Sequence, residues 1–422
     1  MVTNYWAPTP TSVSSALTPS PLSPPPLSSA RQSTLRTANL ALVAHHVLSS
    51  SVPISRADIA AATGMTRSTA SRLADDLVDA GILAELAPIP SAGPGRPAVP
   101  LAPPHGTFVA LGLEVNITHL AVRAVDLSGE LLAERIVLDD FTRSDPAVVL
   151  ERLSRLLADV LALGAVGRAR LVGAALALPG LVSDGVLLRA PNLGWSDVRP
   201  ADYLAPVLAP ARLGLLVGNE ANFGALTVGR ERPTSAYQYP SFIYLSGENG
   251  IGAGIVREGR VILGASGFAG EIGHVQVDPA GPLCTCGNDG CLECYAGRRN
   301  ILRAAGLSDK DSPETLVAAY EAGEAQAVAA IEAAAHALGA GLGAAINLLD
   351  IPVVVLGGHL APLTGVLRPL LAEELGRRVL AASWSVPEVV QADADQIPGA
   401  TGAAWALLAQ VVADPVAWMR TA

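Results

Sequence analysis

Apolar residues follow no regular period over residues 1–30, where Pro, Ser and Thr dominate. A segment of this composition buries too little apolar surface to fold, so we expect a disordered Pro/Ser-rich tail. Beyond it the pattern changes, and Leu40, Val43 and Val47 recur at the spacing of one helical face. This spacing predicts a first helix over residues 36–49.

Two further helices are predicted from their start and stop residues. Ser55 followed by Asp58 is the pattern of a capping box, and Gly64 ends the helix that they begin. Thr66 is suited to cap a third helix, which Gly81 ends. Two helices joined by a short turn that holds a glycine are typical of a helix-turn-helix.

Two short apolar runs follow the third helix, at residues 82–86 and 98–102. A stretch rich in Pro and Gly, residues 91–96, separates them. This order predicts two short strands joined by a turn, which is the wing of a winged helix. We therefore expect a winged helix-turn-helix DNA-binding domain over residues 31–104.

The third helix has the two faces of a recognition helix. Ala70, Leu73 and Leu77 share one face and are expected to pack inward. The outward face of its N-terminal half carries residue types that pair with bases and phosphates. The expected DNA contacts are Arg67, Ser68, Thr69, Ser71 and Arg72, with Arg96 at the tip of the wing. The alternative is a scaffold or protein-binding winged helix.

Charge supports a local DNA-reading module and excludes a protein that coats nucleic acid along its whole surface. The chain of 422 residues has a formal net charge of −10. Between residues 31 and 98, however, six arginines stand against five acidic residues, and three of the acids fall in the second half of the third helix. The reading end of that helix is therefore expected to be positive, and it is the local field that acts on DNA.

From Gly106 onward, apolar runs typical of strands alternate with helical stretches. The expected strands cover residues 108–113, 119–125, 171–178, 214–217, 241–245 and 353–356, and the expected helices 146–163, 313–349 and 400–413. The helical stretch 313–349 is expected to break near Gly323 or Gly339. Alternation of this kind predicts an α/β domain over residues 105–422, with helices packed over mostly parallel sheets.

A compact group of cysteines predicts a metal site. Cys284, Cys286 and Cys291 follow His274 within a short segment, whereas a disulfide framework would spread its cysteines along the chain. Three thiolates and one imidazole complete the tetrahedral shell of structural Zn²⁺ and leave no position for a reacting water. Cys294 is expected to be a bystander. The alternative is a set of unligated cysteines beside a core histidine.

The sequence shows neither a signal peptide nor an uninterrupted apolar run of spanning length. Together with clustered rather than dispersed cysteines, this pattern leads us to expect a protein of the reducing cytoplasm with no membrane partner.

Several motifs resemble those of the ROK family of repressors and sugar kinases. They are Gly270-Glu-Ile-Gly-His274, Cys284-Thr-Cys-Gly-Asn-Asp-Gly-Cys291-Leu-Glu293, Pro179-Gly180, Pro191-Asn-Leu-Gly-Trp195, Asn219-Glu-Ala-Asn222 and Gly357-Gly358. The N-terminal winged helix places the chain beside the repressors, because the kinases lack it. The resemblance implies an actin-like, ribonuclease H-like fold of two lobes with a sugar between them.

The family's sugar contacts carry over to six residues of this chain: Asn192, Asn219, Glu220, Glu271, His274 and Glu293. The resemblance also implies that His274 is shared, with one ring nitrogen on zinc and the other towards the sugar. Carboxylates and amides suit this task because each sugar hydroxyl both donates and accepts hydrogen bonds.

Three motifs depart from the kinase pattern. Glu220 stands where a kinase has the Asp that acts as general base, Glu114 and Asn116 replace Asp and Gly of the first phosphate loop, and Glu248 brings a carboxylate into the second. A longer carboxylate misplaces the base, and an added negative charge repels ATP phosphates. We expect a degenerate active site with no catalytic residue.

These observations predict a sugar-responsive transcriptional regulator, expected to repress carbohydrate genes. We expect a homodimer or tetramer on a palindromic operator, with a sugar or sugar phosphate as effector. One alternative is an active ATP-dependent sugar kinase that also binds DNA, and another is an assembly scaffold with an empty pocket. Sugar identity, operator sequence and the sign of regulation are left open by the sequence.

Overall fold

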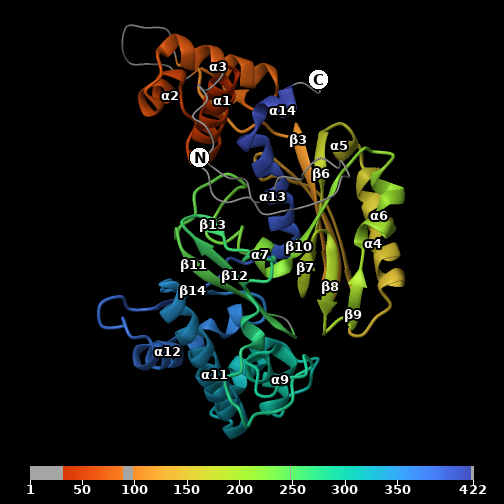
Figure 1. The fold of residues 1–422 in the computed structure, drawn as a ribbon, viewed down its shortest axis with the longest axis vertical. Coiled ribbons are helices and arrows are strands. Elements are labelled where there is room, and N and C mark those ends of the chain that lie inside the picture. The colour runs from red at the N-terminus through yellow and green to blue at the C-terminus, as the bar shows by residue number, and fades with distance from the viewer. Residues whose placement is uncertain (1–31, 89–97, 248, 420–422) are drawn as a thin grey trace, which may run out of the picture.

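A computed structural model describes residues 32–88, 98–247 and 249–419 (Figure 1). The expected tail 1–30, the turn of the wing with Arg96, and Glu248 of the second phosphate loop lie outside the described residues. Within the described parts the chain forms a small N-terminal helical domain and two α/β lobes, with one long C-terminal helix running between the helical domain and the lobes.

The N-terminal domain has the predicted order of helices and wing strands. Its elements are α1 (Gln32–Ser49), α2 (Arg56–Thr63), α3 (Arg67–Asp79), β1 (Ala84–Glu85) and β2 (Leu101–Ala102). Helix α1 begins before the predicted residue 36. Ser55 and Asp58 form the expected capping box on α2, and Thr66 caps α3. Strands β1 and β2 pair antiparallel.

The core of this domain is built from the predicted faces. Leu40, Val43 and Val47 of α1 are buried, as are Leu73 and Leu77 of α3. They belong to a cluster that continues into helix α13 (Pro398–Ala413) and α14 (Pro415–Met419) at the other end of the chain. We call residues 32–102 the reading head; its core is continuous with that of the rest of the protein.

Lobe 1 is built on a five-stranded sheet of order β10-β6-β3-β4-β5. Its elements are β3 (Phe108–Val115), β4 (His119–Asp126), β5 (Leu131–Leu138), α4 (Pro146–Leu161), α5 (Gly164–Gly167), β6 (Arg170–Leu178), α6 (Pro200–Leu208) and β10 (Leu215–Asn219). A second small sheet holds β7 (Leu181–Ser183), β8 (Val186–Ala190) and β9 (Trp195–Val198). Helices α4 and α6 pack together against one face of the large sheet (Figure 1).

Lobe 2 repeats the plan with a sheet of order β13-β12-β11-β14-β15. Its strands are β11 (Phe242–Gly247), β12 (Ile251–Arg257), β13 (Arg260–Val261), β14 (Val353–Leu356) and β15 (Glu388–Gln391). Its helices are η1 (Ile272–His274), α8 (Glu293–Ala296), α9 (Arg298–Ala304), α10 (Pro313–Glu321), α11 (Ala325–Leu349) and α12 (Leu360–Arg378). Two lobes on five-stranded sheets confirm the predicted two-lobed α/β fold.

The predicted direction of the strands is wrong, whereas the predicted break in the long helical stretch is confirmed. The sheets are not mostly parallel, because in each of them two strand pairings are parallel and two are antiparallel. Short turns join β3 to β4 and β4 to β5, and such turns enforce antiparallel pairing. The helical stretch 313–349 breaks at the first of the two predicted positions, Gly323, which adopts a positive φ of 75°, whereas Gly339 lies inside α11.

Helix α7 (Glu220–Gly224) joins the lobes to the helix that carries the reading head. It follows β10 directly, and α13 packs against it and across β3 and β6. The approach is close: a Cβ on Gly402 of α13 would lie 1.8 Å from the carbonyl oxygen of Phe223 in α7. A displacement of α7 would therefore displace α13 as well.

Helix α11 is, among the described residues, the one helix long and apolar enough to cross a membrane by length and composition. Its buried residues, Ala327, Ile331, Leu338, Leu342 and Ile346 among them, pack in the core of lobe 2. The apolar character of this helix is therefore used in packing the lobe.

Candidate functional site

All six residues expected to contact a sugar line one cavity of about 250 Å³. Asn192, Asn219 and Glu220 reach it from lobe 1 and α7, whereas Glu271, His274 and Glu293 reach it from lobe 2. Pro179–Gly180 and Gly250–Gly252 also line the cavity. The structure thus brings together residues that lie up to 101 positions apart in the chain.

Asn219 and Glu220 lie at the N-terminus of α7. The Asn219 side-chain oxygen accepts hydrogen bonds from the backbone N–H groups of Ala221 (2.8 Å) and Asn222 (3.3 Å), so it caps this helix. Its Nδ2 donates to the Gly180 carbonyl at 3.0 Å. Asn219 therefore fixes the start of α7, while Glu220, the first residue of the helix, accepts a 2.9 Å hydrogen bond from Asn116 Nδ2.

The two carboxyl groups from lobe 2 are enclosed. Burial raises the pKa of Glu271. Burial, with a smaller contribution from the charge of Glu271, raises the pKa of Glu293 to about 7. Opposing this, the backbone N–H of Ile251 donates to Glu293 Oε2 at 3.2 Å and Asn192 hydrogen-bonds the same carboxyl group. The Asn192–Glu293 contact joins lobe 1 to lobe 2 across the cavity.

Sequence reasoning missed Arg189, which also lines the cavity. Its guanidinium Nη2 donates a 3.1 Å hydrogen bond to the carbonyl oxygen of Cys286. Arg189 lies near the end of strand β8 in lobe 1 and Cys286 lies in the cysteine-rich loop of lobe 2, so this contact also crosses between the lobes. Its position three residues before Asn192, in Arg189-Ala-Pro-Asn192, was the signal that could have found it.

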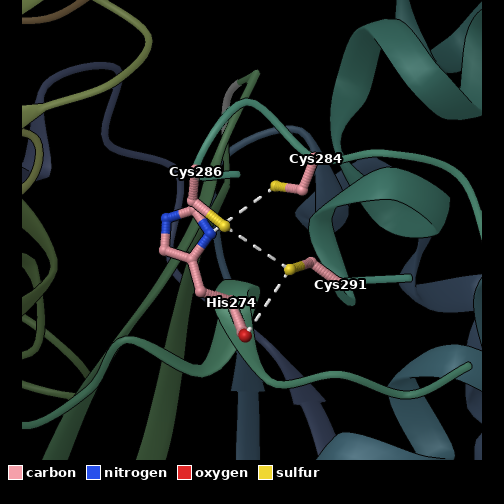
Figure 2. Close-up of side chains that lie close together, drawn as sticks. All are labelled: His274, Cys284, Cys286 and Cys291. Carbon is pink, nitrogen blue, oxygen red and sulfur yellow. Dashed lines mark hydrogen bonds between the residues drawn. The ribbon is translucent and has the colours of Figure 1, made fainter. Parts of the chain in front are cut away.

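The predicted metal ligands converge. The imidazole of His274 and the thiols of Cys284, Cys286 and Cys291 offer ligand atoms that all lie within 4.8 Å of one another (Figure 2). Cys284 Sγ lies 3.8 Å from His274 Nδ1, and Cys286 Sγ lies 3.7 Å from Cys291 Sγ. This donor set fits a tetrahedral metal ion of the zinc type. The cluster is able to bind a metal.

Cys294 is not one of the four grouped ligand residues, although its thiol also interacts with that of Cys284. It falls within α8, and its thiol contacts the carbonyl oxygen of Pro282 at 3.7 Å rather than joining the group of ligand atoms. His274 and Cys286 belong to both sites, because each of them also lines the cavity. A metal bound to this cluster would hold one wall of the cavity in place.

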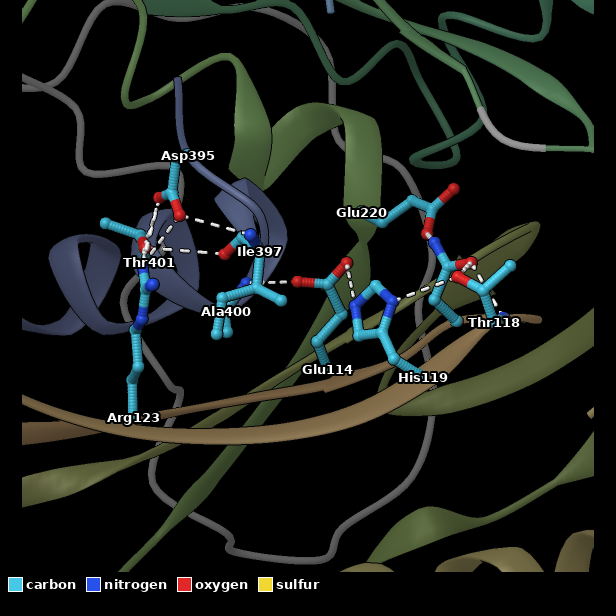
Figure 3. A network of polar contacts seen from close by, with 10 residues as sticks. Glu114, Thr118, His119, Arg123, Glu220, Asp395, Ile397, Ala400 and Thr401 are labelled. Atoms are coloured by element: carbon cyan, nitrogen blue, oxygen red, sulfur yellow. Dashed lines mark hydrogen bonds and ion pairs between the residues drawn. The ribbon is translucent and has the colours of Figure 1, made fainter. Parts of the chain in front are cut away.

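The residues that replace the first phosphate loop are engaged by the protein itself. Glu114, at the end of β3, is almost fully buried, and its Oε2 accepts the backbone N–H of Ala400 in the first turn of α13 at 2.7 Å (Figure 3). Its other oxygen lies 3.4 Å from His119 Nε2. A carboxylate at a helix N-terminus satisfies a backbone donor and interacts well with the helix dipole.

This contact depends on a glycine. A Cβ on Gly399, the residue before Ala400, would lie 2.8 Å from the Glu114 carboxyl group. The N-terminus of α13 is therefore occupied by the Glu114 carboxyl group. A second group of contacts lies close by, where Arg123 bonds both Asp395 and Thr401 (Figure 3).

In the reading head, Arg67, Ser68 and Arg72 are exposed on α3, whereas Thr69 and Ser71 are half-buried. Thr69 bonds the capping residue through its hydroxyl, 2.9 Å from Thr66 Oγ1. The acidic half of α3 is partly neutralised, because Asp76 pairs with Arg36 at 2.8 Å, and Asp75 pairs with Arg56 at 2.5 Å. The exposed end of α3 therefore presents Arg67 and Arg72.

Known proteins resemble both parts of the chain. Residues 110–410 match the ROK family, and residues 48–87 match the IclR helix-turn-helix domain. A protein of Caldicellulosiruptor sp. strain Rt8B.4, provisionally named a xylose repressor, is 32% identical over 346 residues, which is 77% of this chain and 83% of that protein.

Two solved structures align with different shares of this chain. A ROK family transcriptional regulator, a homologue of the E. coli MLC protein, aligns with a TM-score of 0.73 and 26% identity over 91% of this chain and 99% of its own. The ROK hexokinase of Thermus thermophilus aligns with a TM-score of 0.57 and 27% identity, over 99% of its length but only 72% of this chain. The chain belongs to the ROK family, and its helix-turn-helix places it among the transcriptional regulators of that family.

Proposed function

We propose that this protein represses transcription until an uncharged aldose binds in the cavity between its lobes. The observation that carries the proposal is the convergence of Asn192, Glu220, Glu271, His274 and Glu293, from both lobes, on one cavity. A ligand that bonds residues of both lobes favours one arrangement of the lobes over another, and only such differential binding switches a protein.

The charge of the cavity favours a neutral sugar over a sugar phosphate. Three carboxyl side chains, Glu220, Glu271 and Glu293, face one guanidinium, that of Arg189, among the described lining residues. Hydroxyl groups donate well to carboxylates, whereas a phosphate would meet like charge in an enclosed space. Pentoses come first as candidates because a relative carries the provisional name of a xylose repressor.

The metal cluster completes the proposal. We assign Zn²⁺ to His274, Cys284, Cys286 and Cys291, since three sulfur ligands and one nitrogen suit that ion and leave no open position. The bound ion would supply structural rigidity rather than reaction chemistry. His274 would then be held by the metal through one ring nitrogen, with the ring fixed in the wall of the cavity.

Phosphoryl transfer is not part of the proposed function. Glu114 occupies the N-terminus of α13, and Glu220 is bonded to Asn116 instead of standing beside a phosphate loop of the kinase pattern. Transfer requires positive groups and free backbone donors around the moving phosphoryl group. The site retains groups that bind a sugar without those that would phosphorylate it.

DNA binding is assigned to the exposed end of α3, through Arg67, Ser68 and Arg72, with Thr69 and Ser71 beside them. Arg96, which lies outside the described residues, is kept as a contact proposed from the sequence. We propose that a homodimer, alone or as half of a tetramer, sets two reading heads on the half-sites of a palindromic operator in the cytoplasm. Sugar binding would then change the spacing of the heads.

The test is a sugar screen on the full chain loaded with zinc. A sugar at about one hundred times its dissociation constant stabilises the folded protein by roughly 2.7 kcal/mol, a readily measured rise in melting temperature. The sugar found in this way should release the protein from a DNA site selected in vitro by the protein itself. Stabilisation by sugar phosphates alone, or by no sugar, would contradict the proposal.

A further inference from the structure

The segment that follows α7 connects the cavity to the reading head. Residues 225–239, here called the strap, leave the C-terminal end of α7 and lead to β11. Helix α7 begins at Glu220 in the cavity wall, so only a few residues separate a cavity residue from the strap. The strap contacts the reading head before the chain returns to lobe 2.

Two strap side chains bond the end of α1. The hydroxyl of Thr234, which is buried, donates to the carbonyl oxygen of Leu48 at 2.5 Å. The guanidinium Nη2 of Arg232 donates to the carbonyl oxygen of Ser50. The last carbonyl groups of a helix have no partner within the helix, so these bonds serve as its C-terminal caps. The caps of α1 therefore come from the effector domain.

The strap is held rigidly between these contacts and α7. Arg230 lies over the rings of Tyr237, at 4.6 Å, and of Trp405 in α13, at 5.5 Å. Its Nε donates to the Ser235 carbonyl at 2.8 Å and its Nη1 to the Leu226 carbonyl at 3.0 Å. Burial lowers the pKa of this guanidinium. A segment cross-linked in this way transmits displacement instead of absorbing it.

The C-terminal end of α7 is also tightly packed. Phe223 of α7 is fully buried and belongs to the same hydrophobic cluster as Leu48 of α1. The two ends of α7 therefore differ in what they touch: its first turn faces the cavity, and its last turn packs in the core that supports the reading head.

We propose that Arg232 and Thr234 are positioning residues that couple occupancy of the cavity to the orientation of α1. A sugar that bonds Glu220 shifts α7, the strap moves with it, and the two caps carry the displacement to α1 and so to the recognition helix. This inference rests on the proposed function, because it names the residues through which the sugar acts on DNA.

The experiment compares four full-length, zinc-loaded proteins. Thr234→Val removes the hydroxyl and keeps the volume, and Arg232→Met removes the guanidinium and keeps the stem. The matched control is Thr227→Val, whose hydroxyl donates to Gly224 within the same polypeptide stretch, at 2.8 Å, and not to α1. D-xylose, D-glucose and N-acetyl-D-glucosamine are the probes, and the DNA is a site selected in vitro by the wild-type chain.

Each protein is measured for sugar affinity by calorimetry and for DNA affinity with and without sugar. In the wild type and in Thr227→Val, sugar should weaken DNA binding by about 5- to 150-fold, the usual range of coupling between sites. In Thr234→Val and Arg232→Met, both affinities measured alone should stay at the wild-type value while the effect of sugar on DNA binding disappears. Retention of the full effect by both variants would overturn the inference, as would loss of sugar binding in either.

A different readout separates this inference from the proposed function. If no probe sugar binds the wild type or changes its DNA affinity, the proposed function fails, and backbone amide exchange of the sugar-free proteins then decides on the strap. Faster exchange in Thr234→Val at both residues 44–50 and residues 220–225 would support transmission between α1 and α7. A change confined to residues 44–50 would overturn it.

Discussion

Two regions of this protein contain glutamates where a sugar kinase carries its chemistry, and they use them in opposite ways. In the cavity, Glu220, Glu271 and Glu293 line a space between the lobes. At the end of β3, Glu114 is buried against the N-terminus of α13, and it is not among the residues that line the cavity. The carboxyl groups of the first region face a cavity, whereas that of Glu114 hydrogen-bonds the backbone of the protein itself.

Under the proposed function, the difference means that binding and transfer are separable in this fold. Sugar recognition needs acceptors and donors that converge on a cavity, and the two lobes still provide them. Transfer would also need groups that bind the phosphates of ATP. Glu114 instead makes a helix-to-strand contact that holds α13, the helix on which the reading head packs.

The largest effect is expected at the metal cluster, which supports only the cavity side. Cys291→Ser should abolish zinc binding, cost on the order of 5 kcal/mol in folding free energy and remove sugar binding, because structural zinc supplies up to roughly 10–16 kcal/mol in small zinc domains. Metal content and thermal melts measure this. Cys294→Ser is the control and should retain zinc; retention of zinc and sugar binding by Cys291→Ser would refute the ligand set.

The second-largest effect is expected at the close contact between α7 and α13. Gly402→Ala would place a Cβ 1.8 Å from the Phe223 carbonyl oxygen, so α7 and α13 would have to separate, at a cost of about 3 kcal/mol or more. Denaturant unfolding measures the cost. The control is Gly376→Ala in α12, where nothing lies within 4 Å and the change should stabilise by up to about 1 kcal/mol. Equal stabilities of the two variants would contradict the packing described.

A pair of isosteric changes sharpens the comparison itself. Glu220→Gln should weaken sugar binding by about 1.5–3 kcal/mol, the contribution of a charged hydrogen bond, with little change in stability. Glu114→Gln should lower stability by about 1–3 kcal/mol and leave sugar affinity nearly unchanged. For each variant, calorimetry measures the sugar affinity and denaturant unfolding measures the stability. An exchange of the two outcomes would reverse the roles of the two regions.

The smallest effect concerns the reading head. Arg67→Ala and Arg72→Ala should each weaken binding to the selected DNA site by about 1–2 kcal/mol and reduce its dependence on salt. Arg56→Ala is the matched control, since Arg56 is already paired with Asp75 and Glu85. Fluorescence anisotropy at several salt concentrations measures the DNA affinity of the three variants. A loss in Arg56→Ala as large as in Arg67→Ala would move the DNA-binding face away from the exposed end of α3.

Local signals in the sequence carried much of this structure. The capping box of Ser55 and Asp58, the cap at Thr66 and the spacing of the cysteines all act over a few residues, and each lies as predicted. The motif residues of the cavity were found through family resemblance, and the structure brings them together. Their contacts to one another, such as Asn192 with Glu293, were not visible in the sequence.

The parts that escaped prediction depend on distant partners or carry misleading signals. Helix α12 was missed because it contains Pro362, Gly365 and Pro369, yet Leu363, Leu367, Leu371 and Leu375 bury one continuous face and hold it. Strand β12 was missed because it contains two glycines, Gly252 and Gly254, and glycine is uncommon within strands. The role of Glu114 depends on Ala400, 286 positions away, which no local pattern indicates.

The most direct test of the central claim is a measurement of ADP release by the zinc-loaded protein with MgATP and a sugar that raises its melting temperature. The account predicts sugar binding with no ADP formed above the protein-free blank. Sugar-dependent ADP release that disappears in Glu220→Gln would contradict it, and would show that the cavity still performs transfer.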